Sequence, residues 1–208
     1  MYKKFGKRLV DILLSIPGLI LLGILIIPIS ILIYLEDKGP IFYNGARLGK
    51  NGEIFYMYKF RSMKVNAPDI RQADGSTFNS EDDPRLTKVG KFLRKTSLDE
   101  APQVLNVFKG DMSVIGPRPD LPEHKAIYVG NESRKLEIKP GISGYSQAYF
   151  RNSIPWKEKI QNDIYYIDNM SFTLDVKIFI KTAFGVLKSE GIFIEQKNSN
   201  ENEVKNEK

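Results

Sequence analysis

The stretch ILLSIPGLILLGILIIPISILIYL (residues 12–35) decides the architecture of this 208-residue chain. It contains no charged residue, and as a helix it would be roughly 36 Å long, enough to cross a hydrocarbon core of about 30 Å. A basic flank precedes it, which favours the cytoplasmic side of a membrane: Lys3, Lys4, Lys7 and Arg8. The sequence therefore predicts a membrane-embedded helix with its basic flank over residues 1–38.

This segment can be used in more than one way. A cleaved signal peptide is disfavoured, because the apolar run is too long and residues 36–38 follow it without a small-residue cleavage site. Pro17 and Pro28 lie inside the run, and an interior proline removes a backbone hydrogen bond and bends a helix. A break near Pro28 or Gly23 would return the chain to the face it entered from. From the residues alone, a spanning helix and a re-entrant helix both remain open.

Length and composition bound the rest of the chain. One domain of average size is expected over residues 39–188. The chain has no cysteine, which excludes disulfides and thiolate metal sites. The net charge of +6 fits attraction to anionic lipid headgroups or a site for phosphorylated substrates. No nucleic acid is expected as a partner, since no recognised nucleic-acid module is present. Residues 189–208 are polar and aperiodic, so we expect them to be disordered.

The domain combines short strands with helices. Residues 41–63 predict a β-hairpin, because the tight-turn pair Asn51-Gly52 is followed by the aromatic-rich run IFYMYKF. A short strand is expected at residues 112–115. Polar, glycine and proline residues predict a loop at 66–84, long enough to be a flap over a site, and turns at 116–119 and 140–144.

Three helices are expected in the domain. The first covers residues 86–93, with Val89, Phe92 and Leu93 on one side, and the second covers residues 98–108 and stops at Gly110. The third, residues 171–187, mixes apolar side chains with lysines, which fits an interfacial helix or an ordinary core-facing one. The fold class is therefore α+β: an N-terminal membrane helix, a small β-hairpin or sheet, and several interfacial and core helices in one domain.

Asp99 and Glu100 are adjacent acids at the start of the second predicted helix. Pattern alone favours a structural role, because Ser97 to Glu100 fits the S-x-x-E capping box. The alternative is chemical. One carboxylate can attack phosphorus to form an acyl phosphate, and the other can hold Mg²⁺, which binds few protein carboxylates and bridges substrate phosphates.

Cations around this pair support the chemical interpretation. Arg94 precedes the acids, Lys59 comes from the hairpin, and Arg118 lies between two prolines. A proline-flanked arginine has little backbone freedom, so it can present its guanidinium to a phosphate at low entropic cost. A solvated arginine in a surface turn is the competing interpretation. Both acids are expected to be ionised at neutral pH.

The stretch DPRLTKVGKFLRKTSLDEAPQVLNVFKGDMSVIGPRP (residues 83–119) resembles the bacterial sugar transferase family, the small monotopic phosphoglycosyl transferases. The similarity extends back through GPIFYNGARLGKNGEIFYMYKFRSM (residues 39–63). It continues through KPGISGYSQ (residues 139–147) and DIYYIDNMSFTLDVKIFIKT (residues 163–182). Nearly the whole chain to about residue 188 is covered, and the combined signature is specific.

The resemblance implies an enzyme that moves a sugar 1-phosphate from a UDP-sugar to a polyprenol (undecaprenyl) phosphate and releases UMP. It implies a re-entrant membrane helix within residues 1–38 and a catalytic domain over residues 39–188. It also implies a covalent aspartyl-phosphosugar intermediate and the first step of capsule, O-antigen or glycoprotein glycan assembly. The expected location is the bacterial inner membrane, with the catalytic domain facing the cytoplasm and the lipid bilayer as a partner. The alternatives are an enzyme that moves the sugar alone and releases UDP, and a non-catalytic membrane scaffold of a glycan-assembly complex.

The resemblance also implies roles for individual residues. Asp99 matches the nucleophile and Glu100 the acid associated with the Mg²⁺ cofactor. The matches to phosphate-binding and other site positions are these: Arg94, Arg118, Lys59 and Arg151 for phosphate, with Gln147 and Asp163 elsewhere in the site region. Two departures stand out. First, the family usually has a Ser-Pro pair at the bend of its membrane helix, and the matching position here falls near Gly23. Second, this chain has PGISGYSQAYFRN (residues 140–152) where many relatives have a motif like PGITGWAQVNGRN, which adds aromatic bulk to the donor region.

Overall fold

The computed structural model describes residues 2–70, 78, 80 and 82–188. Within these residues the chain forms a mixed α+β structure, with one long apolar helix, two small sheets and several shorter helices, which confirms the predicted fold class. The expected disordered tail lies outside the described residues, and the expected loop at residues 66–84 lies partly outside them.

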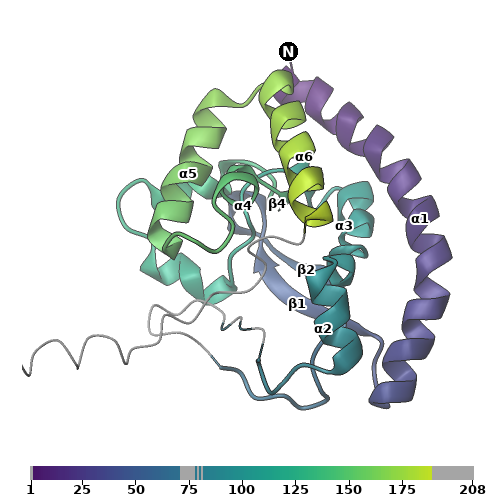
Figure 1. The fold of residues 1–208 in the computed structure, drawn as a ribbon. Helices are drawn as coiled ribbons and strands as arrows, with labels where there is room; N and C mark the ends of the chain where they lie inside the picture. Colours follow the sequence, from purple (N-terminus) through teal and green to yellow (C-terminus); the bar gives the residue numbers. More distant parts are fainter. Residues whose placement is uncertain (1, 71–77, 79, 81, 189–208) are drawn as a thin grey trace, which may run out of the picture.

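The membrane segment is helix α1, Lys7–Glu36, preceded by a π-helical turn at Tyr2–Gly6. The helix is continuous through Pro17 and Pro28, so the break expected near Gly23 or Pro28 is wrong. Instead α1 curves along one side of the domain, with α2 and α3 on its concave side (Figure 1). Its length and apolar composition are sufficient to cross a membrane.

One narrow stripe of α1 packs against the domain. Leu22, Ile29 and Ile33 form a buried core with side chains of the hairpin, α2 and α3. Gly18 allows a close approach to α3, because a Cβ atom there would lie 2.8 Å from a methyl group of Val104. Most of the remaining apolar surface of α1 is exposed, as expected for a helix whose other neighbours are lipid chains.

The predicted hairpin is confirmed. Strands β1 (Phe42–Leu48) and β2 (Ile54–Phe60) pair antiparallel, with Phe42 opposite Phe60. The connection contains Asn51 and Gly52, both with positive φ, and an L side chain rarely adopts that conformation unless it is asparagine or aspartate.

The second sheet is a parallel pair, β3 (Ser113–Ile115) and β4 (Gly141–Ser143). Strand β3 was predicted, but the turn expected at residues 140–144 is wrong because most of that segment is β4. The sequence resembles a turn because it contains glycine, but this glycine serves packing. A Cβ atom on Gly141 would lie 2.1 Å from the backbone nitrogen of Gly116.

The helices are α2 (Lys88–Lys95), α3 (Gln103–Lys109), α4 (Tyr145–Tyr149), α5 (Trp156–Asn169) and α6 (Phe172–Leu187). Leu93 of α2 is buried and Phe92 is exposed, so the expectation that they share one side of the helix is wrong. Helix α3 begins later than expected, after a 3₁₀ turn at Leu98–Glu100, and ends at Gly110 as predicted. Helix α6 buries Ile178 but exposes three phenylalanines along its length: Phe172, Phe179 and Phe184.

Candidate active site

The acidic pair lies in the 3₁₀ turn Leu98–Glu100, between α2 and α3. Ser97, immediately before the turn, has left-handed backbone angles (φ 57°, ψ 15°), and its side chain caps no amide of the turn. A capping box requires an extended residue at the N-cap, so the capping interpretation of this motif is wrong. Both carboxylates are therefore free to serve another purpose.

Glu100 is held by cations from two other segments. Its Oε1 atom lies 2.6 Å from Lys59 Nζ on β2 and 3.9 Å from Arg118 Nη2 in the proline-flanked turn. Burial would raise the pKa of this carboxyl, but the charges of Lys59 and Arg118 and the hydrogen bonds of Lys59 and Gln103 outweigh it and lower the pKa to about 2. Glu100 is consequently ionised throughout the physiological pH range.

The pKa of Asp99 is shifted in the opposite direction. Its side chain is only 7% exposed, and this burial, with a smaller contribution from the neighbouring charge of Glu100, raises its pKa to about 6. The charges of Lys59, Arg94 and Arg118 act in the other direction and keep the pKa from rising further. At pH 7 the carboxylate is mostly ionised but poorly solvated, which is the state expected of a nucleophile or a general base.

The two arginines reach the pair from different elements. Arg94 comes from the last turn of α2, where its Nε atom donates to Ser62 Oγ at 3.0 Å. Burial lowers the pKa of Arg94, and the charge of Asp99 partly offsets that effect. Arg118 is more exposed, at 53% of its side chain, and its guanidinium faces both solvent and Glu100. An anionic substrate can therefore approach Arg118 without displacing protein atoms first.

Three further residues that the family resemblance assigned to the site lie in the C-terminal half of the domain. Gln147 of α4 has both polar atoms of its amide buried, and neither has a hydrogen-bond partner among the described residues. The Arg151 guanidinium packs against α6, where a Cβ atom on Gly185 would lie 2.4 Å from it. Asp163 of α5 is buried and pairs with Lys135 Nζ at 3.3 Å.

Asp163 belongs to a buried charge network that the sequence did not reveal. Lys135 lies between Asp163 and Asp120, and its Nζ is 2.6 Å from Asp120 Oδ2. Burial raises the pKa of Asp163 to about 6, whereas the charge of Lys135 drives that of Asp120 far below its usual range despite burial. Asp120 and Lys135 are 15 positions apart in the sequence, so no local pattern indicates the pair. The charge of Arg118 acts on both Asp163 and Glu100, so the network and the acidic pair share the influence of one cation.

The donor set at the pair fits a magnesium ion. No group of three or more His, Asp or Glu side chains suited to a metal occurs in the part of the chain that the structure describes. Mg²⁺ does not need such a group, because it commonly uses one or two carboxylates together with substrate phosphates and water. Asp99 and Glu100 offer two adjacent carboxylates in a setting that also attracts phosphate.

Comparison with known proteins identifies the family. The model of the family described as "Bacterial sugar transferase" matches residues 2–189. The chain is 42% identical over 186 residues to the uncharacterized sugar transferase EpsL of Bacillus subtilis, covering 89% of each chain. It is 38% identical over 206 residues to the undecaprenyl-phosphate galactose phosphotransferase of Salmonella typhimurium, covering 91% of this chain and 42% of that protein.

A third relative is the UDP-glucose:undecaprenyl-phosphate glucose-1-phosphate transferase of Xanthomonas campestris pv. campestris. It is 38% identical over 197 residues, covering 89% of this chain and 40% of that protein. The chain thus spans nearly the full length of EpsL and about two fifths of the Salmonella and Xanthomonas proteins. A match over residues 2–189, a range that includes the acidic pair and its cations, shows that this chain belongs to the bacterial sugar transferase family.

Proposed function

We propose that this chain transfers a sugar 1-phosphate from a UDP-sugar to undecaprenyl phosphate or a similar polyprenol phosphate at the membrane surface, releasing UMP. The names of the Salmonella and Xanthomonas relatives support this reaction class. The observation that carries the proposal is Asp99, a buried carboxylate on which the charges of Lys59, Arg94 and Arg118 act. Such a transfer begins the assembly of a bacterial polysaccharide or glycan.

The first step is a displacement at the phosphorus atom that bears the sugar. A carboxylate oxygen of Asp99 attacks the β-phosphorus of the UDP-sugar, the bond from that phosphorus to the bridging oxygen breaks, and UMP leaves with the bridging oxygen. The product is a phosphosugar bound covalently to Asp99 as an acyl phosphate. Lys59, Arg94 and Arg118 offset the negative charge that gathers on the phosphoryl oxygens.

The second step restores the enzyme. A phosphate oxygen of the polyprenol phosphate attacks the same phosphorus, the acyl phosphate bond breaks, and the Asp99 carboxylate is released. Two steps replace a direct reaction between two poorly reactive phosphates, which is the general advantage of covalent catalysis. Because α1 places the domain at the bilayer, the acceptor can reach the site by diffusion within the membrane.

Glu100, with Asp99 beside it, is the residue we propose for Mg²⁺. A bound Mg²⁺ would supply positive charge to the diphosphate of the donor. Glu100 is suited to this because its low pKa keeps it ionised and its side chain is 24% exposed. Lys59 Nζ, at 2.6 Å, also supplies a counter-charge to the Glu100 carboxylate.

Both ends of α1 are tied to the same domain, which supports a re-entrant topology. At the N-terminal end, Lys7 Nζ lies 2.6 Å from Asp175 of α6, and Arg8 donates to the carbonyl oxygens of Val107 and Phe108 at the end of α3. At the C-terminal end, the Glu36 carboxylate accepts hydrogen bonds from two backbone amides of α2. A helix that crossed the bilayer would separate these ends, so we propose that it dips into the inner membrane from the cytoplasmic side.

Single cysteines test this topology cleanly, because the chain has none of its own. Phe5→Cys and Lys38→Cys place a thiol at each exposed end of α1. The re-entrant arrangement predicts that a membrane-impermeant maleimide labels both in inside-out vesicles and neither in intact spheroplasts. Labelling of the two positions from opposite sides would show a spanning helix.

The nucleotide product tests the reaction. Detergent-solubilised protein with polyprenol phosphate and Mg²⁺ is screened across UDP-sugars, and we expect UMP release with at least one of them. Asp99→Asn should abolish release, whereas Asp168→Asn, an exposed acid on α5 paired with Arg134, should leave it unchanged. Release of UDP would indicate transfer of the sugar alone. Consumption of no UDP-sugar would indicate a scaffold.

A further inference from the structure

Two adjacent acids end the membrane helix, and each binds a different part of the catalytic domain. The Glu36 carboxylate accepts hydrogen bonds from the backbone amides of Lys88, at 2.6 Å, and Val89, at 2.7 Å. These are the first two amides of α2, which have no partner within their own helix. Glu36 therefore caps α2 from another element, and its charge lies at the positive end of the helix dipole.

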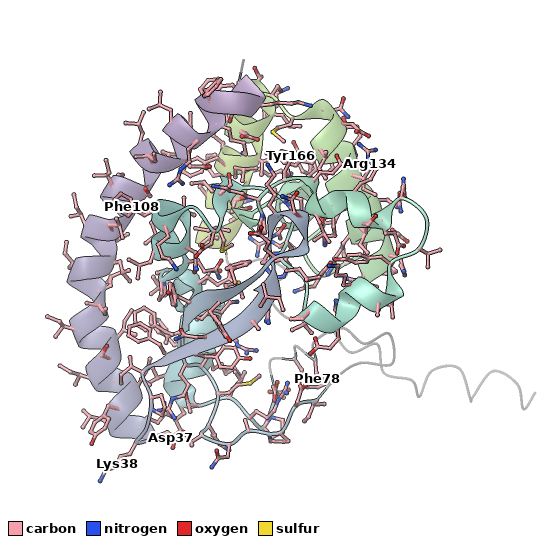
Figure 2. All side chains as sticks on the ribbon, turned by 180° about the vertical axis from the view of Figure 1, so that it is seen from behind. Asp37, Lys38, Phe78, Phe108, Arg134 and Tyr166 are labelled. Atoms are coloured by element: carbon pink, nitrogen blue, oxygen red, sulfur yellow. The ribbon has the colours of Figure 1, made fainter. Side chains whose placement is uncertain are left out.

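Asp37 binds the end of the hairpin through an ion pair and a hydrogen bond. Its Oδ2 atom accepts from Arg61 Nη1 at 3.0 Å and from the backbone amide of Val65 at 2.9 Å, and Arg61 also donates to the Asp37 carbonyl oxygen. Arg61 directly follows β2 and is only 8% exposed. Figure 2 shows Asp37 at the C-terminal end of α1, on the side of the domain, with Lys38 pointing away.

The two elements held by these acids carry active-site cations. Helix α2 carries Arg94, and β2 carries Lys59, which pairs with Glu100 at 2.6 Å. The two elements are also fixed to each other. Arg94 Nε donates to Ser62 Oγ, and Gly90 of α2 lies so close to the Ser62 carbonyl that a Cβ atom on it would be 1.8 Å from that oxygen. A displacement of either element therefore moves both cations.

We propose that Glu36 and Asp37 are positioning residues, which fix the unit formed by α2 and the end of β2, and with it Arg94 and Lys59, to the end of the membrane helix. This inference rests on the proposed function and deepens it. The acceptor phosphate arrives at a depth set by the bilayer, and α1 is the element embedded in that bilayer. Anchoring the cations to α1 keeps them at a constant depth, where they meet the transferring phosphoryl group.

A double-mutant cycle tests whether Glu36 acts through Arg94. Glu36→Gln keeps the size of the side chain but loses the charge, and we expect kcat for UMP release to fall about tenfold with KM for the UDP-sugar changed less than about twofold. In an Arg94→Lys background the same substitution should lower kcat less than about twofold, because the group that Glu36 positions is already altered. Glu36→Asp, which retains the charge, should recover part of the activity.

Glu53→Gln is the matched control, since Glu53 is exposed at the hairpin turn, away from both contacts. We expect it to leave kcat and KM unchanged in either background. Asp37→Asn should reproduce the effect of Glu36→Gln and show the same loss of effect when Lys59 is replaced by glutamine. An equal fall in kcat for Glu36→Gln in both backgrounds, or no fall for either acid, would overturn the proposal.

Hydrogen–deuterium exchange of the full chain in detergent tests the contact itself and does not depend on turnover. In Glu36→Gln we expect faster exchange across residues 88–95, with exchange in α5 as in the wild type. Unchanged exchange at residues 88–95 would overturn the positioning role. If the wild type released no UMP from any UDP-sugar, the proposed function would fail, and the exchange measurement would still decide whether Glu36 holds α2.

Discussion

Replacing Asp99 by asparagine should stabilise the folded protein while it abolishes turnover. Asp99 is buried, and burial raises its pKa from the ordinary 3.8 to about 6. A carboxyl whose pKa is higher in the folded than in the unfolded protein is harder to ionise in the folded state, so its ionisation lowers the free energy of unfolding. Stability is therefore lost as the pH rises through the interval from 3.8 to about 6, and above that interval the cost is complete.

The size of this effect follows from the two pKa values. Their difference corresponds to a cost of about 3 kcal/mol, at about 1.4 kcal/mol for each unit of pKa. Asparagine has nearly the same shape and no charge, so the variant avoids the cost at pH 8 and has little to gain at pH 4. For a chain of this length about 1 kcal/mol moves Tm by roughly 2 to 4 °C, so we expect Asp99→Asn to unfold up to about 12 °C above the wild type at pH 8.

Glu100→Gln is the companion variant with the opposite sign. Its carboxyl has a pKa of about 2 in the folded protein, below the ordinary 4.5, because Lys59 and Arg118 outweigh the effect of burial. A depressed pKa contributes stability that is present above pH 4.5 and lost as the pH falls toward 2. Glu100→Gln should therefore lower the free energy of unfolding at pH 8, by at most about 3 kcal/mol because the loss of its charge also relieves Asp99, and have a smaller effect at pH 3.

Thermal unfolding of the three proteins in detergent micelles at pH 8, 6 and 4 is the assay. The single tryptophan, Trp156, provides the fluorescence signal, and UMP release is measured on the same samples. We expect Asp99→Asn to be inactive and more stable than the wild type, with a gain that shrinks toward pH 4. A lower Tm for Asp99→Asn at pH 8, or a shift of equal size at pH 8 and pH 4, would refute the claim that the ionised Asp99 carboxylate lowers the stability of the folded protein.

Three further predictions concern other contacts. The rate of UMP release should fall toward acidic pH as Asp99 becomes protonated, and Lys59→Gln should move that fall to higher pH because it removes a charge that lowers the Asp99 pKa; an unmoved pH–rate profile would contradict the electrostatic account. Gly90→Ala should disrupt the contact with Ser62 and abolish activity, because the new Cβ would overlap a backbone oxygen; full activity would show that α2 is not fixed there. Lys135→Met should destabilise the protein by about 3 to 5 kcal/mol, since it removes the cation that both buried carboxylates contact, and a loss under about 1 kcal/mol in denaturant unfolding would argue against the network.

The parts of the fold that the sequence predicted are those encoded in adjacent residues. Asn51 and Gly52 tolerate the positive φ angles of the hairpin connection, and Gly110 provides the left-handed residue that ends α3. The features that the sequence predicted wrongly depend on contacts between distant segments. Gly141 was interpreted as a turn residue, although its lack of a side chain serves the close approach to Gly116 across the second sheet. The continuity of α1 through Pro28 likewise depends on packing that no local pattern reports.

The candidate site shows the same division. Asp99 and Glu100 could be selected from the sequence as an acidic pair, but pattern alone assigned them a capping role. The left-handed backbone of Ser97 excludes that role, and it is a property of how α2 joins α3. The approach of Lys59 and Arg118 to Glu100 joins three segments, so a single sequence gives no direct signal for it. The resemblance to the family supplied what local physics did not.

The most direct test of the account is to look for the bond it requires at Asp99. Wild-type enzyme mixed with its UDP-sugar and Mg²⁺, without polyprenol phosphate, is quenched in acid within seconds, digested and analysed by tandem mass spectrometry. We predict a phosphosugar adduct on the peptide that contains Asp99, which disappears when polyprenol phosphate is added and never forms in Asp99→Asn. Formation of UMP and of the lipid product at the full rate with no adduct on Asp99 at any time would contradict covalent transfer through this residue.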